Sequence, residues 1–194
     1  MGPLKEKALE GLRVTRAGPL ALLQDAGRFG VRHLGVTQGG PADLHAWAWA
    51  NRLTGNTWGT TALEITFGGL ELVAERAMTL AITGADLGAR HNHQPAPCWH
   101  AFQVKPGDTL TFASPLNGLR AYLAVAGGFD GEAVMGSTAC VVREQLGGID
   151  GLGSPLREGD RLMVQKANRQ TGGTPAASPP DIIDYNANVT LDCL

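Results

Sequence analysis

The sequence predicts a mainly β protein whose short strands form a barrel or sandwich. Glycine makes up 27 of the 194 residues, about twice its usual share of a protein. Short apolar runs recur along the chain, and strong turn signals separate several of them. These runs occupy residues 12–17, 20–25, 62–67, 70–74, 78–84, 101–104, 109–113, 119–127 and 161–165. Their regular spacing favours a barrel or sandwich over a doubly wound parallel sheet.

The turns and one helix can be placed in this pattern. Residues 105–108 and 157–160 each put a Gly-Asp pair between two apolar runs. Residues 41–56, PADLHAWAWANRLTGN, begin with a proline suited to a first helical position and continue with apolar residues at helical spacing. We expect this helix to cap one open end of the barrel.

The composition disfavours several classes of partner and environment. The formal net charge of -2 disfavours nucleic-acid binding, which needs a basic surplus. No run approaches the roughly 18 apolar residues of a membrane span, and the first residues lack a signal-peptide core. The three cysteines, Cys98, Cys140 and Cys193, are odd in number and widely spaced. We therefore expect reduced thiols, a cytoplasmic location and no membrane partner.

The chain divides by composition into three parts. Residues 12–166 carry the β pattern and form one predicted domain. Residues 167–188 are rich in proline, glycine, serine and alanine, which is typical of a linker. Only VTLDCL, residues 189–194, follows. We expect this to be the stub of a second domain and the chain to be truncated there.

One segment invites a metal-binding interpretation. Residues 91–100, HNHQPAPCWH, contain His91, His93, Cys98 and His100, all possible zinc ligands. No second ligand pair has the spacing of a zinc finger. We therefore favour a solvated hairpin with Asn92 and Pro95 in its turn, and expect no metal. The chain also lacks a P-loop and a G-x-S-x-G nucleophile elbow.

Polar side chains gather in the glycine-rich segment 24–43, which leads into the expected helix. They are Asp25, Arg28, Arg32, His33, Gln38 and Asp43. Loops on a rigid scaffold often carry binding residues, and arginine binds a carboxylate through two N–H groups. Either this segment recognises a carboxylate or amide, or Asp25 and Arg28 pair with each other and with loop amides to hold the loop's shape.

Two further carboxylates lie near predicted strand ends among apolar neighbours. Glu64 lies in ALEITF and Asp86 follows ITGA. A carboxylate in such surroundings is either hydrogen-bonded to backbone amides or part of a functional site. The residues alone leave both alternatives open.

Seven motifs occur in one order along the chain. They are QDAGRFGVRHLGVTQGGPAD (24–43), ANRLTGN (50–56), ALEITFGG (62–69), ITGADLGA (82–89), RAYLAVAGGFD (120–130), MGS (135–137) and LREGDRL (156–162). Over residues 12–165 the sequence resembles the KipA family. That family is also known as the 5-oxoprolinase C subunit family or as allophanate hydrolase subunit 2-like, and often as a biotin-dependent carboxyltransferase family. The resemblance implies that 12–166 is a cyclophilin-like β-barrel, the first half of a two-domain unit.

The resemblance also implies an activity and partners. The chain would be the C subunit of an ATP-dependent 5-oxoprolinase, which opens the lactam of 5-oxo-L-proline to L-glutamate. Its partners would be a KipI-type protein, the B subunit, together with a LamB/YcsF-type protein, the A subunit. The complex would use ATP, while this chain would bind no cofactor and would be inactive alone. Our catalytic candidates are Asp25 and Arg28. Our substrate-binding candidates are Arg32, His33, Gln38, Asp43, Glu64 and Asp86.

Two alternatives belong to other functional classes. In the first, the chain is a carboxyltransferase component that acts on urea or a similar small amide in a biotin-dependent system. Biotin is required only in this alternative. In the second, the chain is a non-catalytic antagonist of a KipI-type kinase inhibitor. Adjacent genes for a biotin carboxylase would favour carboxyl transfer, and adjacent KipI-type and LamB/YcsF-type genes would favour lactam opening.

Overall fold

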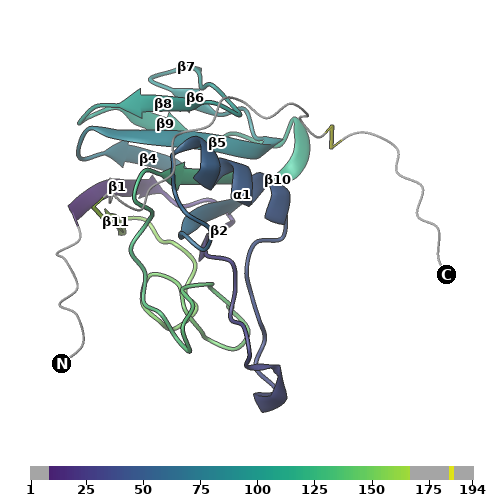
Figure 1. The fold of residues 1–194 in the computed structure, drawn as a ribbon. Coiled ribbons are helices and arrows are strands. Elements are labelled where there is room, and N and C mark those ends of the chain that lie inside the picture. The colour runs from purple at the N-terminus through teal and green to yellow at the C-terminus, as the bar shows by residue number, and fades with distance from the viewer. Residues whose placement is uncertain (1–8, 167–183, 186–194) are drawn as a thin grey trace.

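The structure, a computed structural model, describes residues 9–166 together with residues 184–185. The described strands form two antiparallel sheets (Figure 1). The six-stranded sheet has the order β11-β1-β4-β9-β6-β7 and the five-stranded sheet the order β2-β3-β10-β5-β8. The strands are β1 (Leu9–Arg16), β2 (Leu20–Gln24), β3 (Ala62–Thr66), β4 (Glu71–Ala74), β5 (Met78–Asp86), β6 (Arg90–His91), β7 (Gln94–Pro95), β8 (Ala101–Val104), β9 (Thr109–Thr111), β10 (Asn117–Val125) and β11 (Arg161–Val164).

The mainly β prediction is confirmed, and each predicted apolar run overlaps a strand. The described strands pair within two separate sheets and do not close into one hydrogen-bonded barrel. The predicted linker at 167–188, apart from residues 184–185, and the predicted stub at 189–194 lie outside the described residues. Among the described helices, none is long and apolar enough to cross a membrane.

The main core lies between the two sheets. Side chains of a strand point alternately to its two faces, and the inward residues of β1, β3 and β10 are apolar. Leu12 and Val14 of β1, Ile65 of β3 and Leu123 of β10 are fully buried in one cluster. This alternation leaves the opposite face of β3 and β10 free to carry other side chains.

That opposite face of the five-stranded sheet is partly covered by the helix α1 (Leu44–Leu53). Figure 1 shows α1 lying across β5 and β10. Trp47 is fully buried there, and its indole N–H donates to the carbonyl oxygen of Gln24 at 3.0 Å. The helix therefore covers a sheet face, whereas the sequence predicts a position at one end of the barrel. It also begins three residues after Pro41, because Asp43 is its N-cap and accepts from the Ala46 N–H at 2.9 Å.

A long loop, which we call the arm (residues 27–40), projects away from the sheets (Figure 1). Near its tip is the 3-10 helix η1 (Arg32–Leu34). The two sides of the arm meet at its base, where the Arg28 N–H donates to the carbonyl oxygen of Gln38 at 2.7 Å. Phe29 and Leu34 on the arm are 66% and 60% exposed. The glycine-rich segment thus forms a projecting element with apolar side chains on its surface.

Candidate functional site

Asp25, one of the two predicted catalytic residues, is saturated with hydrogen bonds from the protein. Its Oδ1 accepts from the Gly27 N–H at 2.8 Å and from the Ser137 hydroxyl at 2.6 Å. Its Oδ2 accepts from the Thr138 N–H at 2.7 Å. Ser137 belongs to the MGS motif, so two of the motifs recognised in the sequence meet at this carboxylate. The geometry is that of an anchor between the base of the arm and the loop after β10.

Arg28, the other predicted catalytic residue, is 1% exposed and belongs to the same anchor. Its Nε donates to the carbonyl oxygen of Val134 at 2.9 Å, and its Nη2 donates to those of Ala139 at 2.7 Å and Ser137 at 3.2 Å. Burial lowers the pKa of the guanidinium, and the nearby charge of Asp25 opposes this shift. The cation is therefore held by carbonyl oxygens inside the protein.

The packing around Arg28 also requires a glycine at position 147. Gly147 has a φ of +67°. A Cβ at this position would lie 2.3 Å from the Ala139 carbonyl oxygen and 2.8 Å from Arg28 Nη2. Only glycine fits there. Asp25 and Arg28 thus each hold the shape of the loop through backbone and hydroxyl groups, but within the described residues they form no ion pair with each other. Their catalytic role stays a prediction.

Three other predicted residues, Arg32, His33 and Gln38, lie together on the arm. Arg32 Nη2 is 3.4 Å from Gln38 Oε1, which accepts a long hydrogen bond, and both Arg32 and His33 are exposed. This part of the arm is tied to the body by the Thr37 hydroxyl, which donates to Glu144 Oε1 at 2.6 Å. These residues face solvent on a projecting element, where a partner or ligand can reach them.

Asp43 and Glu64, both predicted to bind substrate, are brought together on the outer face of the five-stranded sheet. Glu64 is 5% exposed. Its Oε2 accepts from the Ala42 N–H at 2.8 Å and from the Tyr122 hydroxyl at 2.7 Å. The Tyr122 oxygen in turn accepts from the Asp43 N–H at 2.7 Å. One phenol thus connects the N-cap of α1 to the buried carboxylate.

The protonation of Tyr122 follows from its surroundings. Burial raises the pKa of its hydroxyl far above the ordinary value, and the neighbouring negative charge of Glu64 raises it further. The hydroxyl therefore stays protonated and donates a hydrogen bond to Glu64. This leaves the other carboxylate oxygen, Oε1, to interact with something else.

Beside Glu64 lie Thr66 and Arg120, and we call Glu64, Thr66, Arg120 and Tyr122 the sheet-face cluster. Arg120 Nε is 3.7 Å from Glu64 Oε1, and the Arg120 side chain is 42% exposed. Within residues 9–166 and 184–185 its guanidinium has no hydrogen bond. Thr66 is 4% exposed, and its Oγ1 is buried without a partner. The cluster therefore has hydrogen-bonding groups that the described protein does not use.

Of these four residues, the sequence pattern pointed to Glu64 alone and not to Thr66, Arg120 or Tyr122. The available signal was the alternation of side chains along strands. Residues 64 and 66 of β3 share a face, as do residues 120 and 122 of β10. The pairings Arg120↔Thr66 and Tyr122↔Glu64 place these two rows side by side. That register depends on two strands far apart in the chain, so the motifs alone could not supply it.

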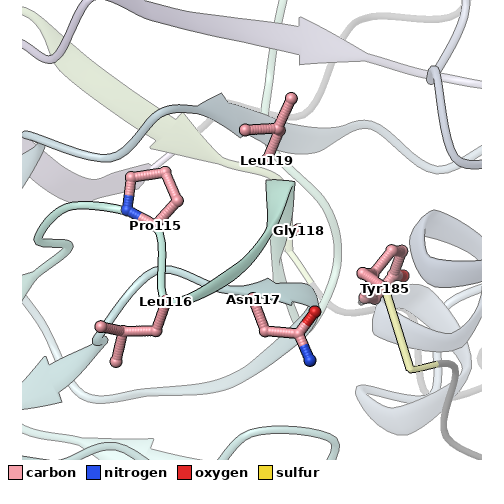
Figure 2. A pocket seen from close by; sticks show the side chains of 6 residues that line it. All are labelled: Pro115, Leu116, Asn117, Gly118, Leu119 and Tyr185. Atoms are coloured by element: carbon pink, nitrogen blue, oxygen red, sulfur yellow. The ribbon is translucent and has the colours of Figure 1, made fainter. Parts of the chain in front are cut away.

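A pocket of about 300 Å³ lies next to the N-cap of α1. Figure 2 shows its lining, which is Pro115, Leu116, Asn117, Gly118, Leu119 and Tyr185. The Tyr185 hydroxyl donates to Asp43 Oδ2 at 2.6 Å, so the pocket and the helix N-terminus share a residue. Asp86, the last predicted residue, is close by. Its carbonyl oxygen accepts from the Leu116 N–H, and its side chain accepts from the Gly88 N–H, each at 2.8 Å.

The histidine-rich segment forms the predicted hairpin, with a different turn. Asn92 and His93 have φ values of 48° and 68°, as a tight two-residue hairpin turn requires, while Pro95 lies in β7. His91 Nε2 is 2.8 Å from Asp108 Oδ2, and His100 Nδ1 is 2.9 Å from the Cys98 carbonyl oxygen. Within the described part of the chain, no group of three or more metal-ligating side chains converges.

Known proteins resemble this chain in sequence and structure. Residues 34–194 match the family described as carboxyltransferase domain, subdomain A and B. The chain is 39% identical over 160 residues to the C subunit of 5-oxoprolinase from Escherichia coli, covering 82% of this chain and 51% of that protein. It is 31% identical over 175 residues to urea amidolyase of Saccharomyces cerevisiae, covering 89% of this chain and 9% of that protein.

A solved structure agrees. The crystal structure of the K. lactis urea amidolyase superposes with a TM-score of 0.77 at 28% identity, covering 93% of this chain and 11% of that one. The chain spans about half the length of its 5-oxoprolinase relatives. The resemblance drawn from the ordered motifs is confirmed: the chain belongs to the carboxyltransferase-domain family, subdomain A and B, which it shares with proteins named as the C subunit of 5-oxoprolinase.

Proposed function

We propose that this chain acts in a 5-oxoprolinase as its C subunit, or as the portion of that protein which it covers. The reaction is the ATP-dependent opening of 5-oxo-L-proline to L-glutamate, carried out with a KipI-type B subunit, together with a LamB/YcsF-type A subunit. The supporting observation is the 39% identity over 160 residues to a protein named as the C subunit of 5-oxoprolinase.

The chemistry explains why ATP is required. A lactam is a stable amide, and water does not open it readily. Transfer of a phosphoryl group to the lactam oxygen makes the ring carbon open to attack by water and turns that oxygen into part of a leaving group. Water adds to that carbon, and the ring C–N bond breaks as the nitrogen takes up a proton. A second water then hydrolyses the resulting acyl phosphate to the carboxylate of L-glutamate and phosphate. In this proposal a partner protein binds ATP, and this chain supplies hydrogen-bond donors for the charge that develops on oxygen.

Reconstitution tests this proposal. The chain should be combined with KipI-type and LamB/YcsF-type proteins from the same source, and ATP-dependent glutamate formation from 5-oxo-L-proline measured. We expect activity only when the chain is present, and none from the chain alone. Glutamate formation at the same rate in mixtures that omit the chain would contradict the proposal.

Carboxyl transfer is a second candidate, supported by the carboxyltransferase description of the family and by the urea amidolyase relatives. Here the chain would accept a carboxyl group from carboxybiotin on a partner and deliver it to a urea nitrogen. The test combines the chain with a biotin carboxylase and a biotinylated carrier, and follows bicarbonate- and ATP-dependent carboxylation of urea. Such carboxylation without glutamate formation in the first assay would favour this candidate.

A further inference from the structure

The sheet-face cluster combines unused donors and an unused acceptor on one surface. The donors are the Arg120 guanidinium, which has no hydrogen bond within the described residues, and the buried Thr66 hydroxyl. The acceptor is Glu64 Oε1, which accepts no hydrogen bond within the described part of the chain and lies 3.7 Å from Arg120 Nε. Few buried polar atoms in native proteins lack a partner, so Thr66 requires an explanation.

The three groups lie close enough to contact one small molecule. Thr66 and Arg120 are direct cross-strand partners in the β3–β10 pairing. Side chains in such a pair have Cβ atoms about 4.5–5.5 Å apart. Glu64 precedes Thr66 by two residues on β3 and so lies on the same face. The other oxygen of Glu64 is held by Ala42 and Tyr122, which fixes the carboxylate in place.

A structural ion pair does not account for this arrangement. Strong pairs of arginine with a carboxylate are frequently bidentate, with two parallel hydrogen bonds of about 2.7–2.9 Å. The 3.7 Å separation between Arg120 and Glu64 is longer than a hydrogen bond. The Arg120 side chain is also half-exposed, and an ion pair of that kind stabilises little.

We propose that the sheet-face cluster is a subsite for a small amide, a choice of substrate class that rests on the proposed function. The amide oxygen accepts from Arg120 and from Thr66, and the amide N–H donates to Glu64 Oε1. The ligand reaches Thr66 by displacing the Arg120 side chain, which no hydrogen bond within the described residues holds in place. A lactam and urea both carry this oxygen and N–H arrangement.

The test measures binding to the 194-residue chain itself by chemical-shift changes of backbone amides. The chain is titrated with 5-oxo-L-proline, with urea below denaturing concentrations, and with L-proline, which has the ring and carboxylate but no amide. We expect the lactam, urea or both to bind with shifts centred on β3 and β10. Equal affinity for L-proline, or no shift with either amide, would overturn the proposal.

A set of threonine variants separates binding from folding. Thr66→Val removes a hydroxyl that has no partner among the described residues, so the melting temperature should stay the same or rise while amide affinity falls roughly tenfold. Thr66→Ser, which keeps the hydroxyl, should retain the affinity. The matched control is Thr83→Val. Thr83 is also buried, and its hydroxyl donates to the Ala46 carbonyl oxygen at 2.7 Å, so this change should lower stability without changing affinity.

These outcomes are independent of the activity assay. Unchanged amide affinity in a folded Thr66→Val chain would overturn the subsite. Amide binding that depends on Thr66, in a chain that supports no glutamate formation, would leave the subsite in place and remove the 5-oxoprolinase proposal. A preference for the lactam over urea identifies a cyclic amide as the ligand, and the reverse identifies urea.

Discussion

The guanidinium of Arg28 donates to the carbonyl oxygen of Ala139 at 2.7 Å, joining residues 111 positions apart in the sequence. With the Asp25 carboxylate, this contact ties the base of the arm to the loop after β10. A charged side chain buried in this way stabilises only as long as its partners remain, because each carbonyl it satisfies is also cut off from water.

Arg28→Met should therefore lower the free energy of unfolding by about 3 kcal/mol, because three carbonyl oxygens each lose a hydrogen bond from the guanidinium. Chemical denaturation measures this as a fall in the midpoint. Arg32→Met is the matched control: Arg32 is exposed, and its change should stay within about 0.5 kcal/mol. Equal stability of the two variants would show that the buried contacts of Arg28 contribute nothing.

Asp43 has two roles that can be separated by substitution. Asp43→Ala should lower stability by about 1 kcal/mol, because α1 loses its N-cap. For a chain of this size that corresponds to a melting temperature roughly 2–4 °C lower. Asp43→Ser keeps a capping oxygen but loses the acceptor of Tyr185, so it should recover most of the stability. A serine variant as unstable as the alanine variant would mean that the Tyr185 contact outweighs the cap.

The two tyrosines of the chain make its alkaline behaviour predictable. Burial raises the pKa of Tyr122, and burial together with Asp43 raises the pKa of Tyr185. Free tyrosine is half-ionised near about pH 10. At that pH the folded chain should show almost no phenolate absorbance.

The same pKa shifts set the sign of the stability change. The unfolded chain releases both protons near about pH 10 while the folded chain keeps them, so stability should fall as the pH rises above that value. Below that pH the contribution is fully present. Tyr122→Phe should reduce this alkaline dependence. Phenolate absorbance at about pH 10 in a chain still folded by circular dichroism would contradict the prediction.

Asp108 should make stability depend on pH in the opposite direction, at acid pH. Hydrogen bonds from the Asn92 side chain, the Lys105 N–H and His91 lower its pKa to about 2. Its contribution to stability is present above its ordinary pKa of about 4 and is lost as the pH falls toward about 2. Unfolding measured across this pH range should depend less on pH in Asp108→Asn. Asn92→Ala removes the largest cause of the shift and should have a smaller effect in the same direction.

The sequence predicted most of the strands because most are short apolar runs with a glycine-containing turn on at least one side. It predicted a hairpin in the histidine-rich segment but not the bounds of its strands β6 and β7, which are two residues long and are defined only by pairing with β9 and with each other. It predicted the position of the helix along the chain correctly, but not that the helix covers a face of the five-stranded sheet. The side of a sheet that a helix covers depends on which strands are neighbours, and that order is not local information.

The candidate site was predicted in the same uneven way. Asp43 and Glu64 were found because charge among apolar residues is visible in a sequence. Their connection through Tyr122 was not, because it joins residues 58 and 79 positions apart. Arg28 looked like a ligand-binding arginine, since its partners are backbone carbonyls that no side-chain pattern reveals. Thr66 looked ordinary because an unsatisfied hydroxyl can be recognised only in a folded environment.

The pairing of β1 with β11 has a consequence for how the protein is made. Leu12 lies opposite Leu162, so the first strand of the described domain completes its pairing with the last. During synthesis, the edge of β1 that pairs with β11 stays unpaired until almost all of residues 9–166 have left the ribosome. Contacts this distant in sequence slow folding, and an unpaired apolar strand is a target for chaperones or for aggregation in the meantime. Substitutions that weaken β11 should therefore reduce the soluble yield in cells.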